Sequence, residues 1–161
     1  MVITMSNLNI LQRMHCLKPS AVAVVRGSRE YPDIKGNVRF CRLKDGVLVE
    51  AQIYGLPDKE GTNGVFAFHI HSGESCSGNT EDPFADALIH YNPQGKEHPY
   101  HAGDMPPLFS NSGYALSVFY TDRFKIDDIK GKTVIIHCGV DDFTSQPAGN
   151  AGKKIACGKI S

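Results

Sequence analysis

The sequence predicts an all-β fold, an antiparallel sandwich or flattened barrel with two long polar loops. Short β-branched and aromatic segments recur between turn residues, and no segment sustains a helical period over three turns. Residues 72–112 and 138–153 are rich in Gly, Pro, Asn, Asp and Ser. Loops of such length are uncommon in a compact domain unless they carry function or something other than a hydrophobic core orders them. A metal or a disulfide would do so.

The predicted strands follow one another along the chain. The first is a short β-branched run around Val22 and Val24. Residues 36–44 and 47–54 form the clearest hairpin, because Asp45-Gly46 between them tolerates the positive φ angles of a type I′ turn. The remaining strands are predicted over residues 65–71, 114–120, 132–137 and 155–160.

Length and charge limit the classes of protein. A chain of 161 residues suits one core, and we expect an N-terminal extension over residues 1–20 and a single domain over residues 21–161. The 17 basic and 17 acidic residues cancel, which argues against a nucleic-acid groove or a polybasic membrane contact. Because no signal-peptide core and no stretch of ~18–20 apolar residues is present, we expect a cytoplasmic protein.

The cysteines form an odd set without CxxC spacing. They are Cys16, Cys41, Cys76, Cys138 and Cys157. This pattern argues against a disulfide-dense secreted scaffold and against a cysteine zinc finger. From the residues alone, the default for each cysteine in a reducing compartment is a free thiol, often a buried one.

Histidines gather in two patterns that suit metal ions. His69 and His71 end a predicted strand, where residues i and i+2 share one face and lie roughly 6–7 Å apart. Alone, this pair is also typical of surface histidines on a strand. His98, His101 and Asp104 recur every third residue in a proline-rich loop that follows His90. Three imidazoles and one carboxylate suit tetrahedral zinc.

His137 adds a further imidazole at the end of an apolar strand segment. Taken alone, a histidine there is more often a buried or capping residue. His15, the remaining histidine, receives no role. Two four-coordinate ions need eight ligands, while the set supplies seven residues. One imidazole can make up the difference by binding both ions through its two ring nitrogens.

These residues stand in motifs that resemble, in chain order, those of the copper/zinc superoxide dismutase family. The motifs are Phe68-His69-Ile70-His71, His90-Tyr91-Asn92-Pro93, His98 with His101-Ala102-Gly103-Asp104, Val134-Ile135-Ile136-His137, and Gly149-Asn150-Ala151-Gly152 leading to Ala156-Cys157-Gly158. The resemblance runs from about Ala21 to Ile160. It implies an eight-stranded antiparallel Greek-key barrel or immunoglobulin-like sandwich, which suits the predicted strands.

The resemblance also implies a role for each site residue. The implied copper ligands are His69, His71, His90 and His137, and the implied zinc ligands are His90, His98, His101 and Asp104. His90 is then the bridging imidazolate. Asp141 is implied to link a copper ligand to a zinc ligand through hydrogen bonds. The implied disulfide joins Cys76 to Cys157, which leaves Cys16, Cys41 and Cys138 unpaired.

The implied activity is the disproportionation of superoxide to O₂ and hydrogen peroxide by alternate reduction and oxidation of copper. His90 would leave copper on reduction, take up a proton and deliver it to the second superoxide, while zinc holds the other side of the ring. Lys154 stands where the family usually has an arginine that guides the anion. The positive charge is kept, but the planar donor fork is lost.

Departures from the family pattern suggest a bacterial-type member. The segment from His137 to Lys154 looks shorter than in eukaryotic members, the segment from Cys76 to His90 looks extended, and residues 103–108 look like those of bacterial members. The family pattern also allows a homodimer. Two alternatives remain: a non-catalytic copper-binding or copper-delivery module, and a structural sandwich that binds only zinc. Metal loading followed by an assay of superoxide removal separates them.

Overall fold

The computed structural model describes residues 18–57 and 64–161. In chain order its elements are β1 (Ala21–Gly27), β2 (Lys35–Arg42), β3 (Val47–Tyr54), β4 (Val65–Phe66), β5 (Phe68–His71), η1 (Ala85–Ala87), β6 (Leu108–Phe109), β7 (Ala115–Thr121), α2 (Ile126–Ile129), β8 (Thr133–His137) and β9 (Lys154–Lys159). One antiparallel sheet has the strand order β5-β8-β9-β1-β2-β3-β7, and β4 pairs separately with β6. No helix in these two ranges is long and apolar enough to cross a membrane.

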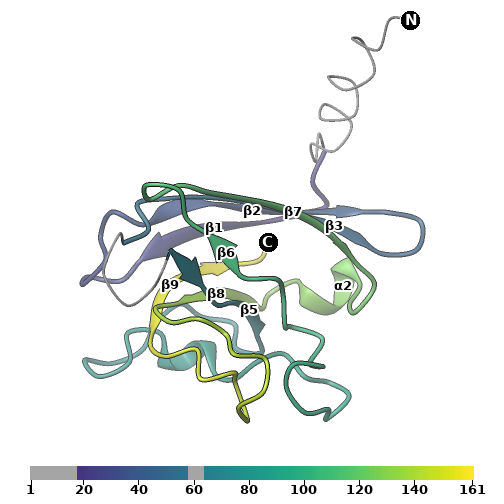
Figure 1. Cartoon of the computed structure of the whole chain (residues 1–161). Coiled ribbons are helices and arrows are strands. Elements are labelled where there is room, and N and C mark those ends of the chain that lie inside the picture. Colours follow the sequence, from purple (N-terminus) through teal and green to yellow (C-terminus); the bar gives the residue numbers. More distant parts are fainter. Residues whose placement is uncertain (1–17, 58–63) are drawn as a thin grey trace, which may run out of the picture.

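The large sheet curls into two layers. Figure 1 shows β1, β2, β3 and β7 above β9, β8 and β5, with both long loops on the outer side of the lower layer. The junction is the short pairing of β1 with β9, at Arg26 and Gly27. The chain passes from the upper to the lower layer between β3 and β5 and again between β7 and β8, as in a Greek key. The predicted all-β antiparallel fold is confirmed.

The strand count depends on how β4 and β5 are treated. Only Ala67 separates them, and its backbone pairs across to β8: Ala67 N–H donates to Gly139 O (2.8 Å) and His137 N–H donates to Ala67 O (2.9 Å). β4 and β5 therefore form one bent strand that pairs with β6 and then with β8. Counted as one, they bring the described strands to the predicted eight.

The main core lies between the two layers. Alternating residues of β1 and β2 are buried, as expected for strands with one face on a core. Phe40 from the upper layer and Phe68, Ile70 and Ile136 from the lower layer are fully buried there. Each such side chain contributes about 1.5–3 kcal/mol through removal of its apolar surface from water. The core thus fixes the lower layer through its inner face, and the side chains of its outer face are available for a site.

The hairpin of β2 and β3 forms, but not through the predicted turn. Arg42 pairs with Val47, so residues 43–46 make a four-residue connection, closed by Leu43 N–H donating to Gly46 O (2.9 Å). Neither Asp45 nor Gly46 has a positive φ, as a type I′ turn requires. Position 46 favours glycine for a different reason, because a Cβ there would lie 2.6 Å from a Tyr120 ring carbon.

The cysteines divide differently from the prediction. Cys76 and Cys157 form a disulfide with Cα atoms 5.6 Å apart, as the resemblance implied, and Cys138 carries a free thiol. The expectation that Cys41 is unpaired is wrong, because its sulfur is disulfide-bonded. Its side chain on β2 is only half-buried, so the core does not enclose the sulfur. The predictions for Cys16, His15 and most of the N-terminal extension lie outside the described residues.

Candidate metal centre

The site is built on β5, an edge strand of the large sheet. Strand alternation turns Phe68 and Ile70 toward the main core and His69 and His71 toward the outer face of the lower layer. The free edge of β5 binds the long loop: Ile70 N–H donates to Gly103 O (2.9 Å), and Tyr91 N–H donates to Ile70 O (2.8 Å). These bonds bring both ligand-bearing parts of the loop against the strand.

Short backbone bridges set the register of that contact. His71 faces His90, and His69 faces Asp104 across the strand edge. Gly103 allows the close approach, because a Cβ there would collide with the Ile70 carbonyl oxygen. Residues that are far apart in the sequence are therefore placed side by side by main-chain hydrogen bonds, before any metal is considered.

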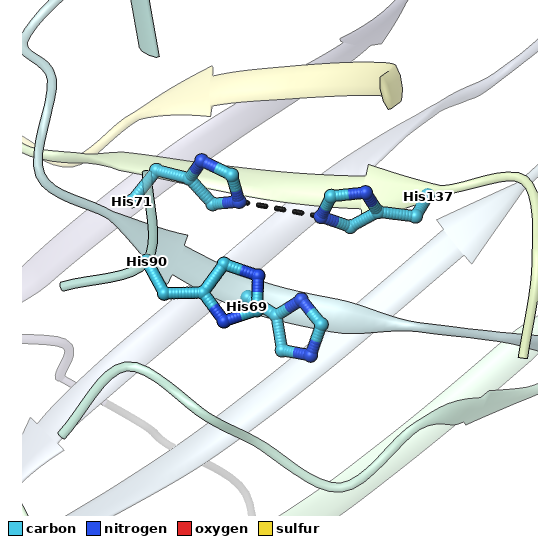
Figure 2. Close-up of side chains that lie close together, drawn as sticks. All are labelled: His69, His71, His90 and His137. Carbon is cyan, nitrogen blue, oxygen red and sulfur yellow. Dashed lines mark hydrogen bonds between the residues drawn. The ribbon is translucent and has the colours of Figure 1, made fainter. Parts of the chain in front are cut away.

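His137 reaches the same face from the end of β8. The register between β8 and β9 shifts between Ile136 and His137, and such irregularities re-aim side chains at the end of a strand. Figure 2 shows the four rings of His69, His71, His90 and His137 gathered together, with His71 and His137 pointing toward each other. One ligand atom from each of the four lies within 4.8 Å of the others, and all four residues are buried.

Outer hydrogen bonds fix how these rings present their nitrogens. His71 Nδ1 donates to Leu88 O (2.9 Å), and His137 Nδ1 donates to Gly152 O (3.0 Å), since a carbonyl oxygen only accepts. Each neutral ring then has a lone pair on Nε2, and the two Nε2 atoms lie 3.2 Å apart. Two lone pairs facing each other at this distance are favourable only with a cation between them.

The second set surrounds the carboxylate of Asp104. Its Oδ1 lies 2.8 Å from His90 Nδ1, and its Oδ2 lies 3.1 Å from His98 Nδ1 and 3.3 Å from His101 Nδ1. All four residues are buried, with their ligand atoms within 4.8 Å of one another. Because His90 belongs to both sets, its Nδ1 faces the second set while its Nε2 is left for the first.

Three buried nitrogens have no hydrogen-bond partner among the described residues: His69 Nδ1, His90 Nε2 and His98 Nδ1. The 3.1 Å contact of His98 Nδ1 with Asp104 is thus close in distance but not aligned as a hydrogen bond. Leaving such an atom unsatisfied costs about 1–3 kcal/mol. An ion in each set would satisfy all three. Four imidazoles suit copper, and three imidazoles with a carboxylate suit zinc, so the residues present fit both metals.

Asp141 connects the two sets through hydrogen bonds to the ring nitrogens that face away from the metal positions. Its Oδ2 accepts from His69 Nε2 (2.8 Å), and its Oδ1 accepts from His98 Nε2 (2.8 Å) and from the backbone N–H of Phe143 (2.8 Å). Burial alone raises the pKa of this carboxyl, but the hydrogen bonds from His69, Phe143 and His98 outweigh it and lower the pKa to about 2. Asp141 is therefore an anion at neutral pH and holds both rings in one tautomer.

Burial keeps His69, His71 and His137 of the copper set neutral. Burial first, and neighbouring imidazoles second, lower the pKa of His69, His71 and His137, in the last case to about 3 overall. Burial raises the pKa of Asp104, but the hydrogen bond from His90 and the surrounding imidazoles lower it overall. Metal binding requires deprotonated ligands, so the lowered pKa values of His69, His71, His137 and Asp104 favour it.

Lys154, at the first position of β9, lies beside the copper set. With His137 it lines a cleft of about 900 Å³ that is also bordered by residues 27–31 and 78–84. Lys154 Nζ donates to Asp82 Oδ2 (2.7 Å) and to Phe84 O (3.1 Å). The sequence indicated Lys154 but gave no reason to single out Asp82, one of several acidic residues in a polar loop.

The sequence also gave no reason to single out Arg123 as a residue that supports the metal centre. Its Nη1 donates to Pro99 O (2.9 Å) and lies 3.4 Å from the carbonyl oxygens of His101 and Asp104. The guanidinium thus holds the backbone of residues 99–104, the part of the long loop that carries zinc ligands His101 and Asp104 and directly follows His98. No pattern marks it, because backbone carbonyls are acceptors at every residue and leave no trace in the sequence.

A curled antiparallel sheet carrying a four-histidine set and a three-histidine, one-aspartate set, with one imidazole common to both, defines a protein with a paired copper and zinc centre. The sequence profile of the family described as copper/zinc superoxide dismutase (SODC) matches residues 34–160. The chain belongs to this family. Its copper site, with His69, His71, His90 and His137, and its zinc site, with His90, His98, His101 and Asp104, are intact, and His90 bridges them.

Relatives include bacterial and animal proteins. Superoxide dismutase [Cu-Zn] 2 of Aquifex aeolicus (strain VF5) is 36% identical over 143 residues, which cover 80% of each chain. Superoxide dismutase [Cu-Zn] A of Xenopus laevis is 35% identical over 156 residues, 87% of this chain and 95% of the relative. The crystal structure of a double mutant of a SOD-like protein from Bacillus subtilis superposes with a TM-score of 0.72 at 26% identity, covering 85% of this chain and 94% of the other. The chain is a copper/zinc superoxide dismutase.

Proposed function

We propose that this enzyme admits superoxide through the cleft beside His137 and that Lys154 attracts and orients the anion there. The observation that supports this is the position of Lys154: it lines the same cleft as a copper ligand and is the first residue of β9. A cation on the wall of a narrow, partly buried cleft attracts a small anion more strongly than one on an open surface. Lys154 has a side chain that is 14% exposed.

The chemistry moves one electron from one superoxide to another in two successive transfers, and the second superoxide takes up two protons. Copper, when bound, supplies the one-electron exchange: one superoxide gives up an electron and leaves as O₂, and a second accepts it and leaves as hydrogen peroxide. His90 presents Nε2 on the copper side, buried and without a hydrogen-bond partner among the described residues. It can therefore hold a proton at Nε2 and pass it to the anion, while its Nδ1 stays fixed beside Asp104 (2.8 Å).

Replacing Lys154 tests its role. We expect Lys154→Ala to lower the rate constant for superoxide removal and to flatten its dependence on ionic strength, because salt screens the attraction that Lys154 supplies. Copper and zinc contents should equal those of the unaltered protein. Loss of copper would mean that Lys154 supports the metal site and does not guide the anion.

A matched control removes the same charge elsewhere. Lys44 lies in the connection between β2 and β3, at the opposite end of the sheet from Gly27 and the cleft. Lys44→Ala should leave both the rate constant and its salt dependence close to those of the unaltered protein. An equal decrease in both variants would show that net charge matters, not the position of Lys154.

Metal loading separates this function from copper delivery. We expect the purified protein to bind one copper and one zinc per chain and to remove superoxide. Stoichiometric copper without superoxide removal would instead favour the non-catalytic module.

Location and assembly remain predictions. We infer a cytoplasmic protein from the sequence, which cell fractionation tests. The family pattern allows a homodimer, which light scattering on the full chain tests.

A further inference from the structure

The ion pair on Lys154 is the feature that the proposed function leaves unexplained. A residue that attracts an anion is expected to present its charge to the cleft, yet Lys154 Nζ lies 2.7 Å from Asp82 Oδ2. The side chain of Lys154 is 14% exposed and that of Asp82 is 40% exposed. A carboxylate at this distance turns the single positive charge into a dipole, whose attraction for an anion is weaker and falls off faster with distance.

Asp82 is held in place independently of Lys154. Its Oδ1 accepts from the backbone N–H of Phe84 (3.0 Å), and its own N–H donates to Asn79 Oδ1 (2.9 Å). Oδ2 is left for Lys154. The same segment supplies the second acceptor of the ammonium, the carbonyl oxygen of Phe84 (3.1 Å). The segment is therefore a preformed acceptor for the Lys154 side chain.

Packing fixes both partners relative to copper ligand His137. Phe84 and Ala87 are buried against Ile135 of β8 and Cys157 of β9, in a small core on the outer face of the lower layer. The disulfide of Cys76 and Cys157 closes this core between the loop that carries Asp82 and the strand that carries Lys154. The pair thus cannot separate by movement of the loop as a whole without disturbing this core.

The charges that line the cleft balance, so that Asp82 affects the net charge of the lining. Its basic residues are Arg29, Lys153 and Lys154, and its acidic residues are Glu30, Glu81 and Asp82. The formal charge of the lining is therefore zero. Loss of one carboxylate makes the lining positive, and loss of the one bonded to Lys154 also frees the ammonium.

From this geometry we propose that Asp82 is a positioning residue that restrains Lys154 and so limits how strongly the cleft attracts anions. The inference rests on the proposed role of Lys154. An incoming superoxide competes with the Asp82 carboxylate for the ammonium, so removing that carboxylate strengthens anion binding. The effect passes through Lys154 and disappears when Lys154 is absent.

The test compares Asp82→Asn, Asp82→Glu, Lys154→Gln and the double variant Asp82→Asn/Lys154→Gln, all loaded with copper and zinc and checked for metal content. Azide is the probe: its affinity is followed by the visible absorption of the copper, and the rate constant for superoxide removal is measured in parallel. We expect Asp82→Asn to raise both roughly two- to fivefold at low ionic strength, with the gain lost in high salt. Asp82→Glu, which keeps the carboxylate, should stay near the unaltered protein.

Glu81→Gln is the matched control, because it removes the same charge one residue away in the same cleft. It should change azide affinity much less than Asp82→Asn does. In the Lys154→Gln background, Asp82→Asn should have little further effect. The inference is overturned if Asp82→Asn leaves azide affinity unchanged or lowers it, if Glu81→Gln matches its effect, or if the gain persists without Lys154.

Failure of the proposed function has a different signature. If Lys154→Gln changes neither azide affinity nor superoxide removal, the guiding role of Lys154 is wrong and the inference falls with it. If Lys154→Gln lowers both while Asp82→Asn changes neither, the guiding role stands and only the restraint by Asp82 is overturned.

Discussion

At the scale of single residues, the metal centre depends on which nitrogen of each imidazole is already occupied. Carbonyl oxygens of Leu88 and Gly152 hold Nδ1 of His71 and His137, and Asp141 holds Nε2 of His69 and His98. The free nitrogens then converge without rearrangement. The apoprotein therefore already has its ligand lone pairs oriented toward the two sites.

Asp141→Asn tests this arrangement directly. An amide keeps the shape but loses the charge, and its NH₂ group cannot accept from one of the two imidazoles. We expect affinity for zinc and copper to fall by roughly 10–100-fold, the range typical of residues that orient metal ligands. Chelator competition measures it. Asp142→Asn is the control, since Asp142 is exposed and its carboxylate accepts from Thr144 and Ser145, not from a metal ligand. Equal losses in both variants would contradict the role of Asp141.

Leu88 has a strained backbone conformation next to the metal centre. Its φ of 63° and ψ of −138° lie close to a region that glycine adopts far more readily than leucine, although the residue is 56% exposed. Its carbonyl oxygen is the acceptor for copper ligand His71. Backbone strain is thus located where a ligand is oriented, and little burial of the leucine side chain offsets it.

Leu88→Gly should therefore stabilise the protein. Relief of about 1–3 kcal/mol of strain, less about 0.5–1 kcal/mol for the greater freedom of glycine in the unfolded chain, leaves a gain of about 1 kcal/mol. Urea unfolding of the metal-free protein with its disulfides intact measures this gain. The neighbouring Ile89→Gly is the control, because Ile89 is similarly exposed (74%) but has no positive φ. Glycine relieves no strain there and only adds freedom to the unfolded chain, so this variant should be less stable. A loss of stability in Leu88→Gly would contradict the strain.

The residue scale is also where sequence reasoning succeeded best. Ligand types and spacing are chemical requirements, so His69, His71, His98, His101 and Asp104 could be identified before any coordinates. Partners that act through a surface ion pair or through backbone carbonyls could not. Asp82 and Arg123 are ordinary charged residues until the fold brings them to Lys154 and to the zinc loop.

At the scale of elements, an edge strand and a loop cooperate. β5 supplies two ligands from its outer face and uses its unpaired edge to bind the loop that supplies four more. This is why the strand prediction held over residues 65–71 while the order within residues 72–112 was beyond reach. Strand alternation is a local property, whereas the path of the loop depends on Gly103 meeting Ile70 and on contacts such as that of Arg123.

Arg123→Met should loosen the zinc loop without altering a ligand. Methionine retains an apolar stem but cannot donate to the carbonyl oxygens of Pro99, His101 and Asp104. We expect zinc affinity to fall roughly tenfold, at the lower end of the range for residues that support metal ligands. Equilibrium competition with a chelator, followed by zinc content, measures this. Arg123→Lys should fall between the two, because one ammonium cannot match the shape of the guanidinium.

The control for Arg123 is Arg42, which is also an arginine with its guanidinium hydrogen-bonded. Arg42 pairs with Asp127 on the surface, with side chains 51% and 70% exposed, and such pairs contribute about 0–1 kcal/mol. Arg42→Met should leave zinc affinity unchanged. If it lowers zinc affinity as much as Arg123→Met does, the effect is general destabilisation and the contacts of Arg123 with the loop do not explain it.

At the scale of the whole molecule, the metal centre lowers the stability of the metal-free protein. Six buried histidines occupy the outer face of the lower layer, and three buried nitrogens among them have no hydrogen-bond partner in the described part of the chain. The disulfide of Cys76 and Cys157 and the small core around Phe84 hold the loop against this face. Stability of the metal-free protein must therefore depend on pH through His69, His71 and His137, whose pKa values are lowered in the fold.

The sign of that dependence follows from the lowered pKa of His69, His71 and His137. His137 has a pKa of about 3 when folded and about 6.5 when unfolded, so between these values the unfolded chain binds the extra proton and acid favours unfolding. His69 and His71 act in the same direction. Asp141, with its pKa near 2, stabilises the fold above about pH 3.8 and loses that contribution as the pH falls toward 2. The two effects add on the acid side.

We therefore expect the free energy of unfolding of the metal-free protein, measured in urea, to fall steadily from pH 7 to pH 4, by up to about 1.4 kcal/mol per pH unit for each such histidine. The copper- and zinc-loaded protein should hold a flat profile to lower pH, because a proton and a metal ion compete for the same nitrogen. It should then lose stability and metal together. His137→Gln should reduce the slope of the metal-free protein. A metal-free profile that is flat between pH 7 and pH 4 would mean that these imidazoles titrate normally in the folded chain and that burial does not keep them neutral.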